Sequence, residues 1–302
     1  MTAFADRLAA AVREKDSCLV VGLDPFLDKL PREILDGAGE TDDPRANAAT
    51  AIERFNAEVI EAVAPFAAAV KPQIAFYEMF GPAGIAAYER TIGLAQEAGL
   101  LVIGDIKRGD IGSTASAYAR AHLDPVPGVP AADAVTLNPY LGRDSVAPFL
   151  DAAARRDAGM FMLVRTSNPS AVELQELDGG GRPLYEGVAA LVDAWGSELI
   201  GESGYSSVGA VVGATAPAAL ARLRELMPRT WFLVPGVGAQ GGAARDVAPA
   251  FARDGLGALV NSSRGILYAY GDPATTTWRD AVAAAARTLR DELREAAAHA
   301  TA

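Results

Sequence analysis

The stretch LLVIGDIK at residues 100–107 combines the two features that decide the fold of this chain, an apolar run and a charged end. A nearly continuous apolar run is typical of a strand that is buried on both faces, as in a parallel sheet. Seven more such runs, with polar or glycine-rich endings, lie at 18–24, 67–73, 132–138, 160–167, 208–215, 231–238 and 257–265. Segments of helical periodicity lie between them. This alternation predicts an α/β fold, a single (β/α)8 TIM barrel.

Three segments lie outside the repeating unit. The first 17 residues have the pattern of an amphipathic N-terminal helix, and the polar connections 36–49 and 168–187 predict insertions after strands 1 and 5. One barrel domain over residues 1–302 accommodates all of them. The alternative, an open doubly wound sheet, usually carries a dinucleotide-binding glycine motif after its first strand. GLDPFLDKLP at 22–31 is not that motif, which favours the barrel.

Composition restricts the class of protein. The formal net charge of −11 argues against a general nucleic-acid binder but leaves room for a local cationic pocket. The single cysteine, Cys18, allows no internal disulfide, and the histidines, His122 and His299, form no metal-binding pattern. No apolar stretch approaches the roughly 18 residues of a membrane span, and the first residues lack the apolar core of a secretion signal. We therefore expect a cytoplasmic protein that binds neither membranes nor nucleic acid.

The chemistry-bearing residues gather at the end of the quoted stretch. The active site of a (β/α)8 barrel lies at the carboxyl ends of its strands. Asp105 and Lys107 are two residues apart on a strand, so alternation predicts that both side chains point to the mouth of the barrel. Asp110 follows in the next loop. Because an ammonium and its flanking carboxylates stabilise each other's charged forms, the spacing indicates either a catalytic charge array or a structural network of salt bridges.

Two glycine-bearing loops predict a phosphate site. Barrels often bind phosphate with the loops after strands 7 and 8, which here contain PGVGAQGG at 235–242 and Arg264-Gly265. Glycine lets backbone N–H groups approach an anion, and arginine adds two parallel donors. The alternative for the first loop is a tight turn that binds nothing. Lys71 and Asp24, which end strands 2 and 1, could likewise be ordinary strand-end and turn residues.

Taken together, these sequence motifs resemble those of one protein family. Asp105-Ile106-Lys107-Arg108-Gly109-Asp110 is similar to the D-x-K-x-x-D signature of the orotidine monophosphate decarboxylases, and the similarity continues through Ile111 and Thr114. Other blocks fall in the family's order over residues 18–268, namely Gly22-Leu23-Asp24, Val70-Lys71, Ser167-Asn168-Pro169-Ser170-Ala171, the loop 235–242 and Arg264-Gly265. The stretch KPQIAFYE at 71–78 resembles the family's longer bacterial variant.

The resemblance implies an activity, the conversion of orotidine 5'-monophosphate to uridine 5'-monophosphate in pyrimidine biosynthesis, without a cofactor or a metal. By the same resemblance, Lys107 would deliver a proton to C6 of the pyrimidine. Asp105 would lie against the departing carboxylate, with Asp110 as a second acidic partner. Lys71 would complete the charge array. Preorganised charge would then stabilise a carbanion that the ring delocalises poorly.

The resemblance also assigns residues to substrate binding and to a partner. Asp24 would bind a ribose hydroxyl, and Ser167 would contact the pyrimidine edge. The loops that hold the phosphate would include Pro235, Gly238, Gln240, Arg264 and Gly265. Asp110, Ile111 and Thr114 would reach into the site of a neighbouring subunit, which implies a homodimer with shared active sites.

Three other functions stay open. A related barrel that acts on sugar phosphates shares a similar strand and uses magnesium, but it usually has another acidic residue near strand 2, where this chain has Lys71. A Schiff-base aldolase would use Lys107 or Lys71 as its nucleophile. A barrel that only binds phosphate would not need the charge cluster.

Overall fold

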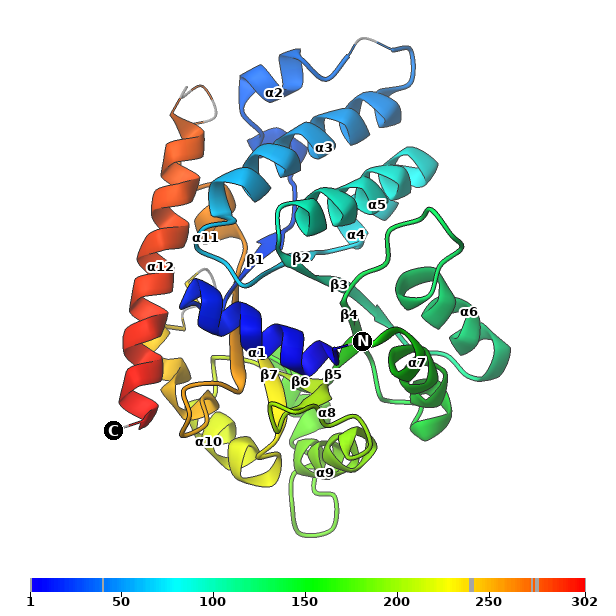
Figure 1. The fold of residues 1–302 in the computed structure, drawn as a ribbon, viewed down its shortest axis with the longest axis vertical. Helices are drawn as coiled ribbons and strands as arrows, with labels where there is room; N and C mark the ends of the chain where they lie inside the picture. The colour runs from blue at the N-terminus through cyan, green and yellow to red at the C-terminus, as the bar shows by residue number, and fades with distance from the viewer. Residues whose placement is uncertain (1, 40, 239–241, 273, 275–276, 302) are drawn as a thin grey trace.

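The eight predicted strands form a closed barrel in the computed structural model, which describes residues 2–39, 41–238, 242–272, 274 and 277–301. Each strand pairs in parallel with the next, and β8 pairs with β1 (Figure 1). The strands are β1 Leu19–Leu23, β2 Ala69–Pro72, β3 Leu101–Arg108, β4 Ala134–Leu137, β5 Gly159–Arg165, β6 Ser206–Val212, β7 Thr230–Pro235 and β8 Ala258–Ser262. The prediction of a (β/α)8 TIM barrel is confirmed.

Helices surround the barrel. The α-helices are α1 Phe4–Lys15, α2 Arg32–Asp36, α3 Pro44–Val63, α4 Ala75–Glu78, α5 Gly81–Glu97, α6 Gly112–Leu123, α7 Arg143–Arg156, α8 Val172–Gln175, α9 Leu184–Gly196, α10 Pro217–Leu226, α11 Arg264–Leu267 and α12 Trp278–Thr301. In the described residues, 3-10 helices lie at Leu27–Lys29, Pro169–Ala171 and Ala244–Ala250. The last of these replaces an α-helix between β7 and β8, and α12 packs against both it and α3.

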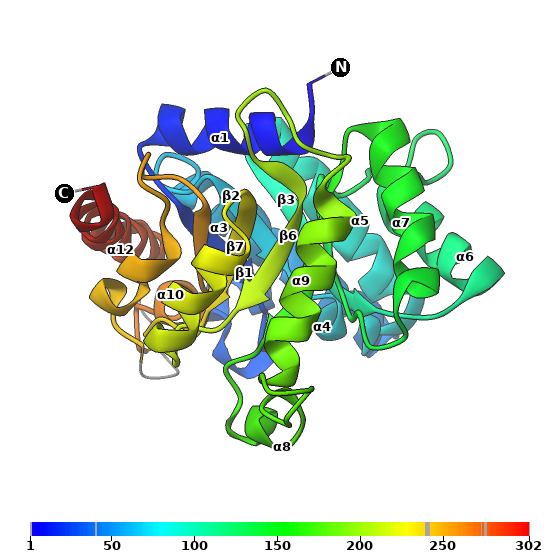
Figure 2. The same ribbon diagram turned by 90° about the horizontal axis from the view of Figure 1, so that it is seen from below.

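Helix α1 covers the amino-terminal end of the barrel. It lies across the strands in Figure 1 and opposite α8 in Figure 2. Its buried residues Phe4 and Leu8 belong to the same core cluster as Phe161 of β5. Gly159 allows this packing, because a Cβ atom there would lie 2.1 Å from the Phe4 ring. The predicted N-terminal helix therefore closes one end of the barrel and leaves the carboxyl ends of the strands for a ligand.

The two predicted insertions are present, and the boundary of the first differs from the prediction. Residues 44–49, expected in the insertion, form the start of α3, so the insertion after β1 ends at Asp43. Asp43 accepts a hydrogen bond from the backbone N–H of Arg45 (2.9 Å), and Pro44 occupies the first turn. Both features favour helix initiation within a polar run. The insertion after β5 contains a 3-10 turn and α8 before α9 begins at Leu184.

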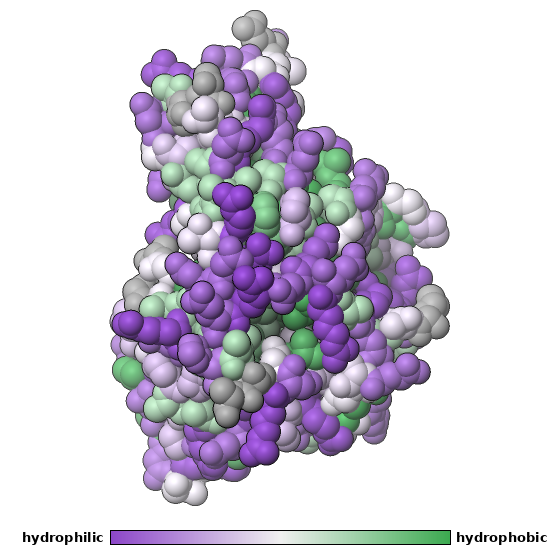
Figure 3. All heavy atoms as spheres, turned by 60° about the vertical axis from the view of Figure 1, so that its left-hand side comes forward, coloured by the Kyte–Doolittle hydropathy of each residue, from purple (hydrophilic) through white to green (hydrophobic). Residues whose placement is uncertain are grey.

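The surface in Figure 3, which brings the α12 side of the molecule forward, is mostly hydrophilic, with hydrophobic residues scattered over it. A span across a bilayer needs about 20 apolar residues in one helix. No helix in the described part of the chain meets that requirement.

Candidate active site

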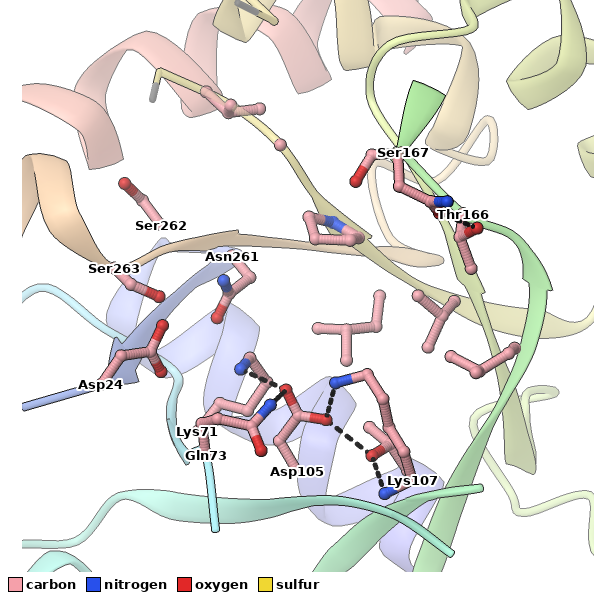
Figure 4. A pocket seen from close by; sticks show the side chains of 18 of the residues that line it. Asp24, Lys71, Gln73, Asp105, Lys107, Thr166, Ser167, Asn261, Ser262 and Ser263 are labelled. Carbon is pink, nitrogen blue, oxygen red and sulfur yellow. Dashed lines mark hydrogen bonds and ion pairs between the residues drawn. The ribbon is translucent and has the colours of Figure 1, made fainter. Parts of the chain in front are cut away.

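A pocket of about 520 Å³ opens at the carboxyl ends of the strands. Its volume falls in the range of small-molecule sites. Charged and polar residues from β2, β3, β4 and β8 line it, together with Asp24 just after β1 and the loops after β5 and β7 (Figure 4). Its polar and charged lining, with the proline that ends β7, includes Asp24, Lys71, Gln73, Asp105, Lys107, Thr136, Thr166, Ser167, Gln175, Pro235, Asn261, Ser263 and Arg264.

The carboxylate of Asp105 lies at the centre of a hydrogen-bond network (Figure 4). Its Oδ2 accepts from Lys71 Nζ at 2.7 Å and from Gln73 Nε2 at 2.9 Å. Its Oδ1 accepts from Lys107 Nζ at 2.5 Å and from Thr136 Oγ1 at 2.7 Å. Four donors from β2, β3, β4 and the residue after β2 thus occupy both oxygens, which fixes the carboxyl group in one orientation.

The contact between Lys107 and Asp105 does not arise from regular alternation of side chains along β3. Lys107 has a φ of 45°, in the left-handed region, and the pairing of β3 with β4 shifts between Gly104 and Arg108. A regular two-residue alternation therefore does not hold there, although both side chains line the pocket at the barrel mouth, as predicted. The distortion turns Lys107 back towards Asp105. Backbone strain at a non-glycine residue costs about 1–3 kcal/mol and tends to occur at functional sites.

Opposite charges stabilise this network. Burial alone would raise the pKa of Asp105, but the positive charges of Lys71 and Lys107 and their hydrogen bonds hold it well below its usual range. Burial would lower the pKa of Lys71, but the carboxylates of Asp105 and Asp24 raise it above its ordinary value. The side chains of Lys71 and Asp105 are only 7% and 6% exposed, whereas that of Lys107 is 45% exposed. Lys107 is therefore the member of the array that a ligand and water can reach.

Two buried oxygens lie without partners between β1 and β8. Asp24 Oδ1 and Asn261 Oδ1 are shielded from solvent and form no hydrogen bond with any described residue. Gly22 makes room for this corner, because a Cβ atom there would lie 1.9 Å from Ser263 Oγ and 3.3 Å from Asn261 Oδ1. An unpaired buried acceptor is costly. This corner suits a ligand group that donates hydrogen bonds, such as a hydroxyl.

The loop after β5 forms another wall of the pocket. The N–H of Thr166 donates to Gln175 Oε1 at 2.9 Å, and Gln175 Nε2 donates to Thr166 Oγ1 at 2.7 Å. Helix α8 therefore holds this loop through its last residue. Gly213, just after β6, lets the loop approach, because a Cβ atom there would lie 2.8 Å from that of Ser167. Ser167 thus lies in the pocket wall.

The residues expected at the phosphate end are only partly brought together. Pro235 and Arg264 line the pocket, whereas Gly238 and Gly265 do not. Gln240 lies outside the described residues. Arg264 is exposed, and its side chain forms no hydrogen bond or ion pair with any residue that the structure describes. Its guanidinium group is therefore available to an anionic ligand.

Asp110, Ile111 and Thr114 do not line this pocket. They lie between the end of β3 and the first turn of α6, where Asp110 Oδ1 accepts a hydrogen bond from the N–H of Ile111 at 2.7 Å. Ile111 and Thr114 are exposed. In one chain, these three residues therefore lie outside the pocket that Asp105 and Lys107 line.

Comparison with known proteins identifies the family of this chain. Residues 19–279 match the model of the orotidine 5'-phosphate decarboxylase / HUMPS family. The matched segment includes every strand of the barrel. The chain belongs to this family. Its predicted resemblance to the orotidine monophosphate decarboxylases is therefore confirmed.

Relatives named orotidine 5'-phosphate decarboxylase cover nearly the whole chain. The protein of Rhodopirellula baltica is 45% identical over 97% of this chain and 100% of its own length. That of Haloarcula marismortui is 48% identical over 90% of this chain and 89% of its own. The structure of Leishmania donovani OMP decarboxylase superposes with a TM-score of 0.75 at 36% identity and covers 98% of this chain and 99% of the other. The orotidine 5'-phosphate decarboxylase / HUMPS family thus accounts for both sequence and fold.

Several pocket residues of this family member were not assigned a role from the sequence, among them Gln73, Thr136, Gln175 and Asn261. Gln73 and Asn261 lie directly after or at the end of predicted strands, so their position could have indicated a place in the pocket. Thr136 reads as an ordinary strand residue. Gln175 lies eight residues beyond the predicted end of its strand, and no local pattern places it in the pocket.

Proposed function

We propose that this protein decarboxylates orotidine 5'-monophosphate to uridine 5'-monophosphate in pyrimidine biosynthesis, as a single catalytic domain over residues 1–302. The observation that carries the proposal is the array Lys71–Asp105–Lys107 at the mouth of a barrel of this family. The full-length relatives named for this activity support it.

The array suits the chemistry of this reaction. When the bond between C6 and the carboxylate breaks, its electron pair stays on C6 in an orbital that the ring delocalises poorly. The ammonium of Lys107 would stabilise that carbanion electrostatically and then transfer a proton to C6. Asp105 would hold Lys107 in place. The neutral amine would regain its proton from water, which the half-exposed Lys107 side chain can reach.

Substrate binding would use the remaining walls of the pocket. Asp24, whose Oδ1 lacks a partner, would accept a hydrogen bond from a ribose hydroxyl. Ser167 would contact the pyrimidine edge. Arg264 would bind the phosphate, with Pro235, Gly238, Gln240 and Gly265 in the surrounding loops. Binding energy from the distant phosphate can then help to position the reacting base.

A direct assay tests the activity. Loss of orotidine 5'-monophosphate absorbance is followed with excess EDTA, and we expect undiminished turnover. The donor set favours this outcome, because two lysines surround Asp105, and the described residues hold no group of three His, Cys, Asp or Glu side chains placed to bind a metal. Dependence on added magnesium would instead favour a sugar-phosphate lyase of the same family.

The proposed contact between Arg264 and the phosphate leads to a second prediction. We expect Arg264→Ala to weaken binding of uridine 5'-monophosphate by about 100-fold, because a charge-assisted bidentate contact is lost. Binding of uridine, which lacks the phosphate, should be nearly unchanged. Calorimetric titration of both ligands measures the difference. Equal losses for nucleotide and nucleoside would remove Arg264 from the phosphate site.

We propose further that two copies of the chain share their active sites. Asp110, Ile111 and Thr114 would enter the partner's pocket. Exposed apolar side chains in the loops after the neighbouring strands β2, β3 and β4 support an interface there, namely Met79, Ile111, Tyr140 and Leu141. Large exposed apolar residues that gather on one rim commonly mark an interaction site.

Subunit mixing tests the shared site. Lys107→Ala and Asp110→Ala should each be inactive alone. A hybrid dimer would keep one site with both residues intact, so mixing after partial unfolding should restore activity. The hybrid is compared with each variant treated alone in the same way. No recovery in a mixture that sedimentation shows to contain dimers would contradict the shared site.

A further inference from the structure

Two uncharged side chains also donate hydrogen bonds to the Asp105 carboxylate, and the mechanism proposed above assigns them no role. Gln73 Nε2 lies 2.9 Å from Oδ2, and Thr136 Oγ1 lies 2.7 Å from Oδ1. Each oxygen of the carboxylate therefore accepts from one lysine and one neutral group. The two neutral donors come from opposite neighbours of β3, the residue after β2 and the middle of β4.

The hydrogen-bond chemistry fixes the direction of both neutral contacts. Gln73 Oε1 accepts from the backbone N–H of Ala75 at 3.4 Å, so its amide nitrogen faces Asp105. Thr136 Oγ1 accepts from the backbone N–H of Lys107 at 3.1 Å, which leaves its own proton for Asp105. An ionised carboxylate can only accept. Both side chains are therefore oriented to recognise Asp105 as an anion.

The backbone holds Gln73 in place. Its N–H donates to the carbonyl of Leu23 on β1 at 3.3 Å, and the residue forms a parallel bridge with Asp105. The N–H of the next residue, Ile74, donates to the carbonyl of Asp105 at 3.3 Å. This short extension of β2 therefore ties β1 to β3 beneath the side-chain contact. The Gln73 amide starts from a fixed point, so little freedom is lost when it binds the carboxylate.

We propose that Gln73 and Thr136 are positioning residues that keep Asp105 ionised and in one orientation throughout the reaction, an inference that rests on the proposed function. Once Lys107 has given its proton to C6, it no longer attracts Asp105 as a cation. Lys71, Gln73 and Thr136 still donate to the carboxylate at that moment. Asp105 therefore does not take up a proton, and water returns the missing proton to Lys107.

A consequence for pH dependence follows from the groups that face Asp105. Lys71 and Lys107 are its cationic neighbours, the carboxylate of Asp24 interacts with Lys71, and the buried phenol of Tyr88 on α5 is close enough to interact with the charge of Asp105. Burial and the charge of Asp105 raise the pKa of Tyr88, so that phenol stays neutral. Donors to the charged form lower the pKa of a carboxyl group, and removing one raises it. The acid limb of kcat should then move to higher pH.

Two pairs of variants test the proposal with orotidine 5'-monophosphate as the probe, across about pH 5 to 9. Thr136→Val and Gln73→Met remove one donor each with little change of shape. We expect kcat to fall about 10- to 100-fold, the loss typical of a hydrogen bond to a charged group, with KM changed far less. Thr136→Ser keeps the hydroxyl and should restore most of kcat.

Gln73→Glu changes the pH dependence of kcat, which would stay the same if Gln73 had only a structural role. At neutral pH its carboxylate repels Asp105, so kcat should be below that of Gln73→Met. On acidification the new carboxyl group is protonated and can donate again, so the optimum should shift to lower pH. The proposal is overturned if Gln73→Met retains the kcat of the unaltered protein, or if Gln73→Glu follows Gln73→Met at every pH.

The unaltered protein, assayed alongside, separates this inference from the proposed function. If it does not consume orotidine 5'-monophosphate, the proposed function fails. If it does, and the Thr136 and Gln73 variants keep its kcat, only the positioning role fails. Thermal melting confirms that each variant is folded. If a Gln73 variant does not fold, the Thr136→Val and Thr136→Ser pair decides the outcome.

Discussion

Replacing Lys107 by alanine should lower kcat for orotidine 5'-monophosphate by about 10⁴-fold or more, since the proton donor and the charge beside the developing carbanion are lost together. The fold should persist, because the side chain is 45% exposed and its removal leaves little empty space in the core. A stopped assay with long incubation measures the residual rate, and circular dichroism reports the fold.

Two control variants sharpen this prediction. Lys107→Arg keeps the positive charge, but a guanidinium group does not give up its proton in proteins, so kcat should stay low while substrate binding is largely retained. Lys15→Ala removes a lysine from the end of α1, across the barrel from the pocket, and should keep full activity. An active Lys107→Ala variant, or an active Lys107→Arg variant, would refute the role of Lys107 as proton donor.

Asp105→Asn should damage both activity and stability. The asparagine has the same shape, but it removes the negative charge between two lysines and turns an N–H₂ group towards donors. Lys71, only 7% exposed, would lose its hydrogen-bonded counter-ion. Breaking a buried pair in this way commonly costs about 3–5 kcal/mol of unfolding free energy. We expect kcat to fall by about 10³-fold or more, and urea titration to show the lower stability.

The stability loss should depend on pH in a defined direction. The pKa of Asp105 in the folded protein lies below its unfolded reference value of 3.8. Its stabilising contribution is therefore complete above that value and is lost as the pH falls through the folded pKa. The stability difference between the unaltered protein and Asp105→Asn should be full at neutral pH and should narrow below about pH 4.

Asp133→Asn is the matched control for this effect. Asp133 forms an ion pair with Arg7 of α1 at the opposite end of the barrel. Its replacement can lower stability, but kcat should be unchanged because the pocket is untouched. A loss of kcat in Asp133→Asn similar to that in Asp105→Asn would mean that the activity loss reports general destabilisation.

Most of the fold could be predicted because barrel strands are buried on both faces. That burial requires near-continuous apolar runs such as LLVIGDIK, and each run overlaps a strand of the structure. The end of the first insertion could not be read in the same way. The polar run continues into the first turn of α3, so its start at Pro44 could not be predicted, although the helical periodicity from residue 46 could.

The candidate site was predictable as far as strand ends define it. Asp24, Lys71, Asp105 and Lys107 all end or follow an apolar run, and all line the pocket. The distortion of β3 could not be predicted, because the residue in the left-handed conformation, Lys107, is not a glycine. The neutral donors Gln73 and Thr136 were missed as partners of Asp105 for a related reason. The group to which an amide or a hydroxyl on a strand donates can be identified only when the residues on the neighbouring strands are known.

A crystal structure with bound uridine 5'-monophosphate would probe the proton-transfer geometry most directly. We expect the nitrogen of the Lys107 side chain to lie within about 3.5 Å of ring carbon C6, which loses its substituent in the reaction, while still contacting Asp105. If that nitrogen instead points into solvent, with the pyrimidine against another wall of the pocket, Lys107 is not the proton donor.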